Sequence, residues 1–267
     1  MTVVAVVGDA VTTTTVAIAA GWPASEDVLV LEADPGGGSL AGWLDLPAQP
    51  SLATIVANAG TDAERNDRSV LDTVDAMARR SESGIRLIAT AVRARAADRA
   101  VEEAGLVVLP ALAASPRTVL ADVGAHRGGP PPPAIRLADV VVVVHRQATA
   151  SAGAASVRID RLVETVEELA HLDATLVLAV IGATPFDPAE IGTFLDEAVP
   201  DTVHHTASIA DDPLAAATLA GRAGVSVKRL HRLPLMRDAA RLATGLAELV
   251  GARQPAPVRI GSEDVSP

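Results

Sequence analysis

Short runs of apolar residues alternate along the chain with longer stretches in which apolar residues recur at helical spacing. Runs such as VVVVVH at 140–145 are apolar at nearly every position, which is typical of central strands in a parallel sheet covered by helices. The expected strands are Val3–Val7, Val28–Glu32, Arg86–Ala89, Val119–Asp122, Val140–His145, Thr175–Ile181 and Val203–Thr206. The expected helices are Thr14–Ala20, Ala96–Ala104, Ala152–Ala170, Pro188–Val199 and Leu235–Val250.

This alternation of strand and helix predicts an α/β fold with a doubly wound, mostly parallel sheet flanked by helices. We expect one domain over residues 1–250. The charged stretch 60–83 predicts a surface helix, and GGPPPP at 128–133 predicts a rigid turn. From Gly251 onward the chain is rich in proline and polar residues, so residues 251–267 are expected to form a disordered tail.

Composition narrows the class of protein. No apolar run reaches the roughly 18 residues that a membrane-spanning helix needs, and the chain has no Cys, which excludes disulfides and thiolate metal sites. We therefore expect a cytoplasmic protein without an integral membrane segment. The net charge of −11 argues against broad coating of nucleic acid. Among the 22 basic residues, Lys228 is the only lysine.

The first segment with candidate chemistry is GDAVTTTT at 8–15, a turn that leads from a strand into a helix. A phosphate-binding loop needs glycines, exposed N–H groups, a lysine for the β and γ phosphates and a hydroxyl for Mg²⁺. Here only Gly8, the threonines and the helix N-terminus meet these needs. From this segment alone, a threonine-rich start of a buried helix is the simpler interpretation.

Two further segments end their strands with carboxylates. VLVLEADPGGG at 28–38 contains Glu32 and Asp34 before a glycine turn, and TVLADVG at 118–124 contains Asp122 before Gly124. A carboxylate at a strand end, followed by a flexible turn, can hold Mg²⁺ or a catalytic water beside a γ-phosphate. The carboxyl ends of parallel strands are where doubly wound sheets bind ligands, so we expect these carboxylates at that edge.

In this order, the three segments resemble the MinD/ParA family of deviant Walker-type P-loop ATPases. VTTTT at 11–15 lines up with the family's VGKTT, EADPG at 32–36 with its DxDPQ, and Asp122 with its Walker B aspartate. ADVVVVVHRQATASAGAA at 138–155 and IADDPLAAATLAGRAGVSVKRL at 209–230 are similar to later parts of the family. The resemblance extends to Val250 and implies a P-loop NTPase-like fold of the MinD/ParA type.

The resemblance also implies a nucleotide site. Its phosphate-binding residues would be Gly8, Thr12, Thr13, Thr14 and Thr15. Thr14 and Asp122 would hold Mg²⁺, and Asp34 would be the catalytic residue if the protein hydrolyses ATP. The implied cofactors are ATP or ADP with Mg²⁺, and the absence of any cofactor is an equal alternative.

This sequence departs from the family at both loop lysines, one of which binds phosphates within its subunit while the other reaches across the dimer. Thr13 and Gly8 stand at those positions. A charge-assisted hydrogen bond is worth about 1.5–3 kcal/mol, and the lysine also stabilises charge in the transition state. The strand end at Ile181 also lacks the family's frequent asparagine. The sequence therefore predicts a degenerate Walker A site and a pseudo-ATPase with little or no hydrolysis.

Three functions remain open. The resemblance implies spatial positioning, partitioning or partner recruitment for chromosomes, the septum, pili or secretion machinery. An active ATPase of the same family would need phosphate contacts other than lysine, for which Arg127 and Arg146 are candidates, although arginines at element ends usually extend into solvent. A nucleotide-free structural subunit would use Asp34 and Asp122 only to cap strand ends.

The resemblance implies protein partners as well. Members of the family dimerise, so we expect a homodimer or a heterodimer with a paralogous ATPase through Gly8–Thr15, Asp34–Ser39 and Val123–Gly129. Family members that bind DNA use scattered basic residues, partly near the carboxyl end. Weak DNA contact is accordingly expected through Arg222, Lys228, Arg229 and Arg232. The alternative is a solvated helix face with local ion pairs.

Overall fold

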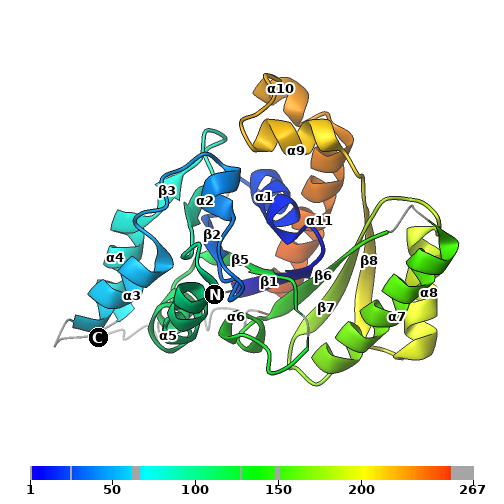
Figure 1. Cartoon of the computed structure of the whole chain (residues 1–267), viewed down its shortest axis with the longest axis horizontal. Helices are drawn as coiled ribbons and strands as arrows, with labels where there is room; N and C mark the ends of the chain where they lie inside the picture. Colours follow the sequence, from blue (N-terminus) through cyan, green and yellow to red (C-terminus); the bar gives the residue numbers. More distant parts are fainter. Residues whose placement is uncertain (1, 25, 62–66, 127, 148–150, 254–267) are drawn as a thin grey trace, which may run out of the picture.

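A computed structural model of the chain describes residues 2–24, 26–61, 67–126, 128–147 and 151–253. At its centre is an eight-stranded sheet with the order β3-β4-β2-β5-β1-β6-β7-β8 (Figure 1). All neighbouring strands are parallel except β3 and β4. The strands are β1 (Thr2–Gly8), β2 (Val28–Glu32), β3 (Arg79–Arg80), β4 (Arg86–Ile88), β5 (Thr118–Gly124), β6 (Val140–Arg146), β7 (Thr175–Ile181) and β8 (Val203–Ile209). The predicted doubly wound α/β fold is confirmed.

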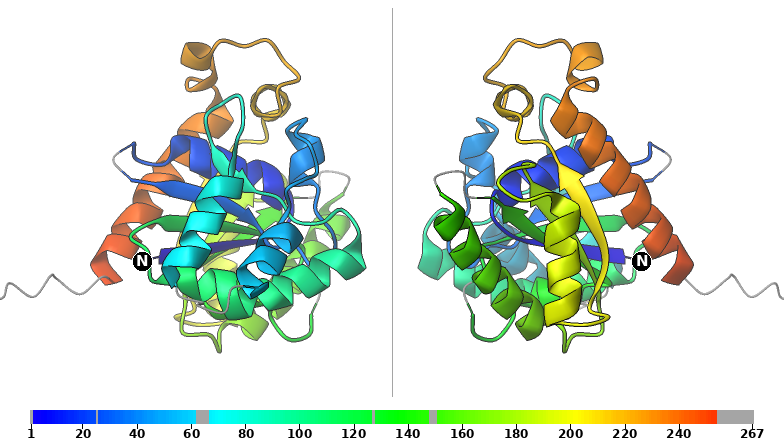
Figure 2. Two further views of the ribbon diagram at one scale, coloured as in Figure 1. Left: turned by 90° about the vertical axis from the view of Figure 1, so that its left-hand side faces the viewer. Right: turned by 90° about the vertical axis from the view of Figure 1, so that its right-hand side faces the viewer.

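Helices cover both faces of this sheet (Figures 1 and 2). One face carries α1 (Val11–Gly21), α2 (Leu40–Trp43), α9 (Pro213–Leu219), α10 (Val227–Leu230) and α11 (Pro234–Arg253). The other carries α3 (Leu52–Thr61), α4 (Asp67–Met77), α5 (Ala94–Ala113), α6 (Pro133–Arg136), α7 (Ala152–Leu169) and α8 (Pro188–Ala198). Alternate residues of β1 enter the two layers, since Val3 and Ala5 pack on one side and Val4 and Val6 on the other. The strands are therefore buried on both faces, as their continuous apolar runs predict.

The strand order fixes where the candidate residues meet. β1 lies between β5 and β6, and β2 lies on the far side of β5. Because these strands are parallel, their carboxyl ends share one edge of the sheet. Glu32 is in register with Asp122, and Asp122 is in register with Val6 of β1. The first loop and both carboxylate segments therefore lie together.

Several helix boundaries differ from the sequence-based predictions. α1 begins at Val11 rather than Thr14, and α5 covers Ala94–Ala113 rather than Ala96–Ala104. Gly105 and Pro110 look like helix breakers in the sequence, but both lie inside α5. A Cβ on Gly105 would stand 2.4 Å from the Cβ of Pro133, so this glycine allows α6 to pack closely against α5.

The predicted single helix over the charged stretch 60–83 is wrong. α3 ends at Thr61, α4 spans Asp67–Met77, and the short strand β3 follows. Pro133, predicted within the rigid turn, is instead the first residue of α6, a position where its missing N–H is not needed.

The first residues of the predicted tail, from Gly251 to Arg253, are helical. α11 continues through Arg253, so the helix does not stop at Val250. Residues 254–267, the rest of the predicted tail, lie outside the described residues. Within the described part of the chain, no helix is long and apolar enough to cross a membrane.

Candidate functional site at the carboxyl edge of the sheet

The loop after β1 runs directly against β6. Gly8 has a φ of 119°, and a Cβ there would lie 2.2 Å from the carbonyl oxygen of Val144. The N–H of Asp9 donates to the same carbonyl at 2.8 Å. Ala10, with a φ of 50°, then leads into α1 without a side-chain cap. A lysine at position 8, as in the family's loop, would collide with β6 on this backbone path.

The threonines of the loop do not share one environment. The Thr14 hydroxyl donates to the Ala10 carbonyl at 3.0 Å, and Thr14 is 2% exposed. Thr15 is fully buried, and its hydroxyl has no hydrogen-bond partner in the part of the chain that the structure describes. Thr12 faces the next loop, with its hydroxyl 3.4 Å from that of Ser39. Thr13 and Thr14 line a separate cavity. Of the predicted phosphate ligands, Thr15 therefore points into the protein, and Thr14 has its hydroxyl bonded within the loop.

Asp9 is a contributor that our sequence reasoning missed. Its carboxylate accepts the N–H of Arg146 at 3.1 Å and forms an ion pair with Arg158 of α7. The loop is thereby attached to both β6 and α7. The available signal was local, since Asp9 replaces a glycine of the family's KGGVGKTT. Its distant partner Arg158 gave no signal in the sequence.

Glu32 shapes the glycine turn that follows β2. This carboxylate is 1% exposed and accepts the N–H groups of Ser39, Leu40 and Thr90 at 2.6, 2.7 and 2.8 Å. Burial raises the pKa of Glu32, while these main-chain hydrogen bonds oppose the shift. A Cβ on Gly38 would stand 2.6 Å from the carboxylate, so the turn needs glycine there. Glu32 thus connects the turn to the end of β4.

Asp34 joins the loops that follow β2 and β5. Its Oδ1 accepts the N–H of Gly36 at 2.7 Å. A Cβ on Gly124 would lie 2.2 Å from Oδ2 of Asp34, and Gly124 has a φ of 72°. Only glycine permits this close approach without strain. The structure thus brings Asp34 and the segment after Asp122 into contact.

Asp122 is as deeply buried as Glu32, whereas Asp34 is half-buried. Asp122 is 1% exposed; its Oδ1 accepts the Gly124 N–H at 3.2 Å, and its Oδ2 has no hydrogen-bond partner among the described residues. Burial raises the pKa of Asp122 to about 7, with Glu32 and Asp34 adding to the shift and Thr12 and Gly124 opposing it. Within the described ranges, no group of three or more His, Cys, Asp or Glu side chains could hold a metal ion. At neutral pH Asp122 is therefore poised between its neutral and charged forms.

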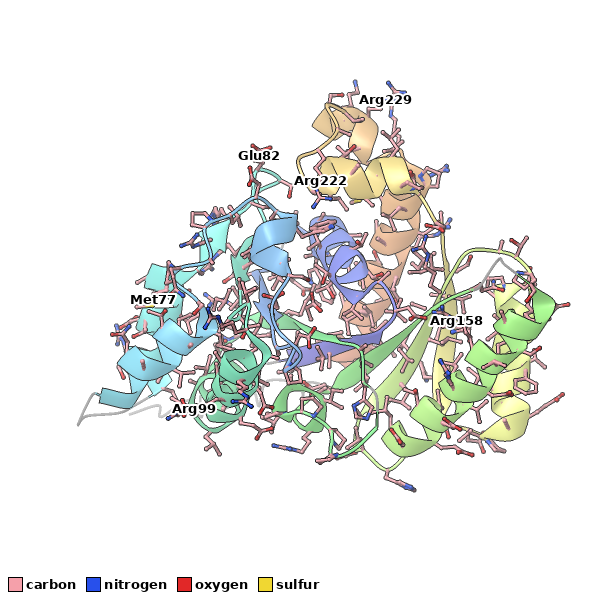
Figure 3. The ribbon with its side chains drawn as sticks, viewed as in Figure 1. Met77, Glu82, Arg99, Arg158, Arg222 and Arg229 are labelled. Carbon is pink, nitrogen blue, oxygen red and sulfur yellow. The ribbon has the colours of Figure 1, made fainter. Side chains whose placement is uncertain are left out.

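A cavity of about 320 Å³ opens beside the N-terminus of α1. Thr13, Trp43, Arg146 and Arg222 line it. Arg146 pairs with Asp211 at 2.7 Å, so it is not simply solvated. Arg222 donates to the carbonyl of Trp43 at 3.3 Å, and Figure 3 shows it below α9 on the side of α2. Two arginines thus border this cavity, each with a partner.

The basic residues near the carboxyl end differ in their surroundings. Lys228, Arg229 and Arg232 are exposed, and Figure 3 shows Arg229 at the outer tip of α10. Arg222 instead belongs to the cavity beside α1. Arg127, a candidate phosphate contact from the sequence, lies outside the described residues.

No family model and no curated protein sequence matches the chain. A ParA family ATPase from Chlorobium tepidum TLS resembles it with a TM-score of 0.65 and 16% identity, over 92% of this chain and 98% of that one. The septum site-determining protein MinD from Pyrococcus horikoshii OT3, complexed with Mg-ADP, gives 0.62 and 16%, over 95% and 98%. The MinC:MinD cell division protein complex of Aquifex aeolicus gives 0.59 and 14%, over 97% and 98%. The chain therefore has the fold of the MinD/ParA ATPases.

Proposed function

We propose that this chain is a positioning or partner-recruitment protein of the MinD/ParA type that works without hydrolysing ATP. A fold in common with a ParA family ATPase and a septum site-determining MinD supports the first part. The absence of any lysine from residues 8–15 supports the second. Lys228, the single lysine, belongs to α10, apart from the loop (Figure 1).

The observation that carries the proposal is the internal use of the Thr14 hydroxyl. Thr14, which lines up with the family's Mg²⁺ ligand, donates its hydroxyl to Ala10 and is almost fully buried. Asp9 is held by Arg146 and Arg158, which fixes the loop from its other side. The hydroxyl at the family's Mg²⁺ position and the Asp9 carboxylate are therefore both used within the protein.

The charges at this edge of the sheet also disfavour a bound triphosphate. Glu32 and Asp34 both raise the pKa of Asp122, which indicates a negative potential at this edge of the sheet. A triphosphate would add further negative charge there, and residues 8–15 contain no basic side chain to offset it. These residues do not fit a magnesium triphosphate held in the manner of a lysine loop, so the proposed role includes no phosphoryl transfer.

Without a nucleotide cycle, the protein would act through its association state. We propose nucleotide-independent pairing, with a second copy or with a paralogous ATPase, through Gly8–Thr15, Asp34–Ser39 and Val123–Gly129. Contacts between Thr12 and Ser39 and between Asp34 and Gly124 bring these segments together at one edge of the sheet. The cellular contexts are those of the fold's relatives, such as septum placement or partitioning.

The cavity beside α1 favours a second candidate, an ATPase that holds its nucleotide with arginine. Arg146 and Arg222 border about 320 Å³ next to a helix N-terminus, which attracts anions. Asp34 would then be the catalytic residue. Both arginines would first have to leave Asp211 and the Trp43 carbonyl.

Phosphate release from MgATP separates the two candidates. If the protein works without hydrolysing ATP, the wild-type protein releases no phosphate above background. The variants Arg222→Gln and Asp34→Ala should then release no more and no less than the wild type. Steady release that either substitution abolishes would establish the arginine-based ATPase and overturn the proposal. Lys228→Gln is the matched control, because this basic residue is exposed and belongs to α10 rather than to the cavity.

We also propose weak DNA contact through Lys228, Arg229 and Arg232. All three are exposed at or next to α10. Contacts of this kind release counterions, so any affinity should fall steeply between about 50 and 200 mM salt. Fluorescence anisotropy with a labelled duplex tests this. Binding that survives replacement of all three residues by Gln would exclude this surface.

A further inference from the structure

A second cavity, of about 610 Å³, lies beneath the first loop on the α7 side of the sheet. It is bounded by Gly8 and Asp9, by the loop after β5, by the end of β6 and by α7. Among the described residues, none lines both this cavity and the one beside α1. Neither the fold nor the proposed function assigns a role to this space.

Hydrogen-bond donors gather in this cavity from three elements. Arg158 and Arg161 are three residues apart on α7 and so lie on one helix face. His126 comes from the loop after β5 and His145 from β6. Figure 3 labels Arg158, where α7 faces the carboxyl end of β6. Donors arranged around one hollow suit an oxyanion.

Both histidines are deeply buried there. The His126 side chain is 5% exposed, and His145 is 4% exposed. Nε2 of His126 lies 3.2 Å from Oε2 of Glu168 but is not aligned for a hydrogen bond, so within the described chain this buried nitrogen has no hydrogen-bond partner. Burial, opposed by Asp9 and assisted by Arg158, lowers the pKa of His145. A buried polar atom without a partner requires an explanation, and a role in binding an ion or a water is one of the few that occur in proteins.

One carboxylate already pairs with one of these donors. Asp9 reaches from the first loop to pair with Arg158. Glu164 and Glu168 also line the cavity, so with Asp9 in place the acidic groups outnumber Arg158 and Arg161 by one. An added anion therefore cannot simply join this arrangement. If it displaces Asp9, the two glutamates and the two arginines of the lining balance, and the anion takes over the negative charge that Asp9 had supplied.

We propose that this cavity is an anion site for a small phosphate-type oxyanion, closed in the free protein by Asp9. The guanidinium of Arg158 binds the incoming anion with two parallel N–H groups, and Arg161 supplies the second charge. His126 and His145 donate ring N–H groups from the opposite wall. Displacement of Asp9 also frees the first loop from α7, so occupancy of the site is coupled to the loop.

Titration with inorganic phosphate, followed through the backbone amide signals of α7 in an NMR spectrum, tests the site. Asp9→Asn keeps the side-chain shape but removes the competing charge, so phosphate should bind at least tenfold more tightly than to the wild type. Adding Arg158→Gln to Asp9→Asn should abolish that binding, whereas adding Arg229→Gln, an exposed arginine on α10, should leave it unchanged. Equal affinities of wild type and Asp9→Asn, or binding that survives Arg158→Gln, would overturn the proposal.

Two further measurements keep the test decisive. If Asp9→Asn does not fold, Arg161→Gln in the wild-type background should weaken phosphate binding at least threefold, and no change would contradict the site. Glycerol phosphate, titrated in parallel, distinguishes a site for phosphate esters from one for the free ion. Anion binding that depends on Thr13 but not on Arg158 would belong to the first loop and not to this cavity, so the proposed function and this inference fail separately.

Discussion

Asp122 is the residue at which the fold alters ionisation most clearly. Its pKa of about 7 in the folded protein lies above the roughly 3.9 of an unfolded aspartate. Between these values the folded state holds more protons than the unfolded state. The free energy of unfolding should therefore fall as the pH rises from about 4 to 7. The raised pKa of Glu32 acts in the same direction.

Asp122→Asn should remove the larger part of that dependence. The amide is close to the carboxyl group in shape but cannot ionise, so we expect the variant to be more stable than the wild type at pH 8, by on the order of 1–3 kcal/mol. At pH 4 the two proteins should differ little. Urea unfolding from pH 4 to 8 measures both. Parallel pH profiles for the two proteins would show that Asp122 is not the group responsible.

The loop threonines allow a gain-of-function test. Thr12→Gly with Thr13→Lys restores the glycine and the lysine of the family's loop, and the glycine matters because a phosphate loop uses positive φ angles that threonine rarely adopts. We expect measurable MgATP affinity by calorimetry. Thr12→Gly with Thr13→Met, which has a long but uncharged side chain, should bind no ATP.

If the double variant with lysine folds but binds ATP no better than this control, the backbone path of the loop has changed as well. The cause would then be the contacts of Gly8 and Asp9 with β6, because both residues hold the loop against Val144.

Among the elements, α4 is attached to the sheet by a closed ion-pair network. Arg86 and Arg117 each pair with both Asp27 and Asp75, at 2.5–3.2 Å. Asp75 belongs to α4, and the other three residues lie at the amino ends of β2, β4 and β5. The burial of Asp75 would raise its pKa, but hydrogen bonds from Arg117 and Arg86 outweigh this, and the pKa is lowered.

Arg117→Met should therefore lower the free energy of unfolding by about 1–2 kcal/mol, because it leaves two neighbouring aspartates with one shared cation. The lowered pKa of Asp75 means that the stabilisation is present above its unfolded pKa and is lost as the pH falls through the folded value. Arg99→Met is the control, since Arg99 forms an exposed ion pair within one helix, a kind of pair that contributes little to stability. Urea unfolding at pH 7 that shows equal effects for both variants would contradict a special role for the network.

The sequence predicts the bounds of an element well where a local apolar pattern sets them, and poorly where tertiary packing does. The strands β2 and β7 match their predicted bounds because their apolar runs are long enough to be buried on both faces. α5 was predicted too short, because Gly105 serves close packing against Pro133 and Pro110 is tolerated inside the helix. These are tertiary effects, and periodicity along the chain does not report them.

The candidate site likewise combines features that the local sequence predicts with features that only the folded structure reveals. Carboxylates at strand ends follow from the sequence pattern, and the structure places Glu32, Asp34 and Asp122 at one edge of the sheet. The ion pair between Asp9 and Arg158 joins residues 149 positions apart, and no local pattern indicates it. The internal hydrogen bond of Thr14 was equally invisible, because the sequence shows only a hydroxyl where the family has one.

For the molecule as a whole, we expect association with a second copy or a partner that does not depend on nucleotide. Val92 is 65% exposed, and its carbonyl lies beside Gly37 at the proposed pairing surface. We expect sedimentation to give the same mass with and without MgATP, for this chain alone or with its partner. Val92→Glu should weaken that association.

Val92 is a better site for an inserted charge than Gly37, whose φ of 113° and neighbouring Val92 carbonyl would strain any side chain. Leu106→Glu is the matched control, since Leu106 is 81% exposed and lies on α5. A monomer under all conditions, with no partner recovered, would remove the support for pairing through this edge. Association that forms only with MgATP would favour the arginine-based ATPase.

We infer above all that the loop at residues 8–15 does not hold a triphosphate. Thermal unfolding of the wild-type protein, with and without millimolar MgATP or MgADP, tests it most directly. A ligand present at about 100 times its Kd adds about 2.7 kcal/mol to the free energy of unfolding, which raises the Tm by several degrees. We expect an unchanged Tm with either nucleotide. A reproducible rise that saturates with MgATP, and that Thr13→Ala or Arg222→Gln removes, would contradict it.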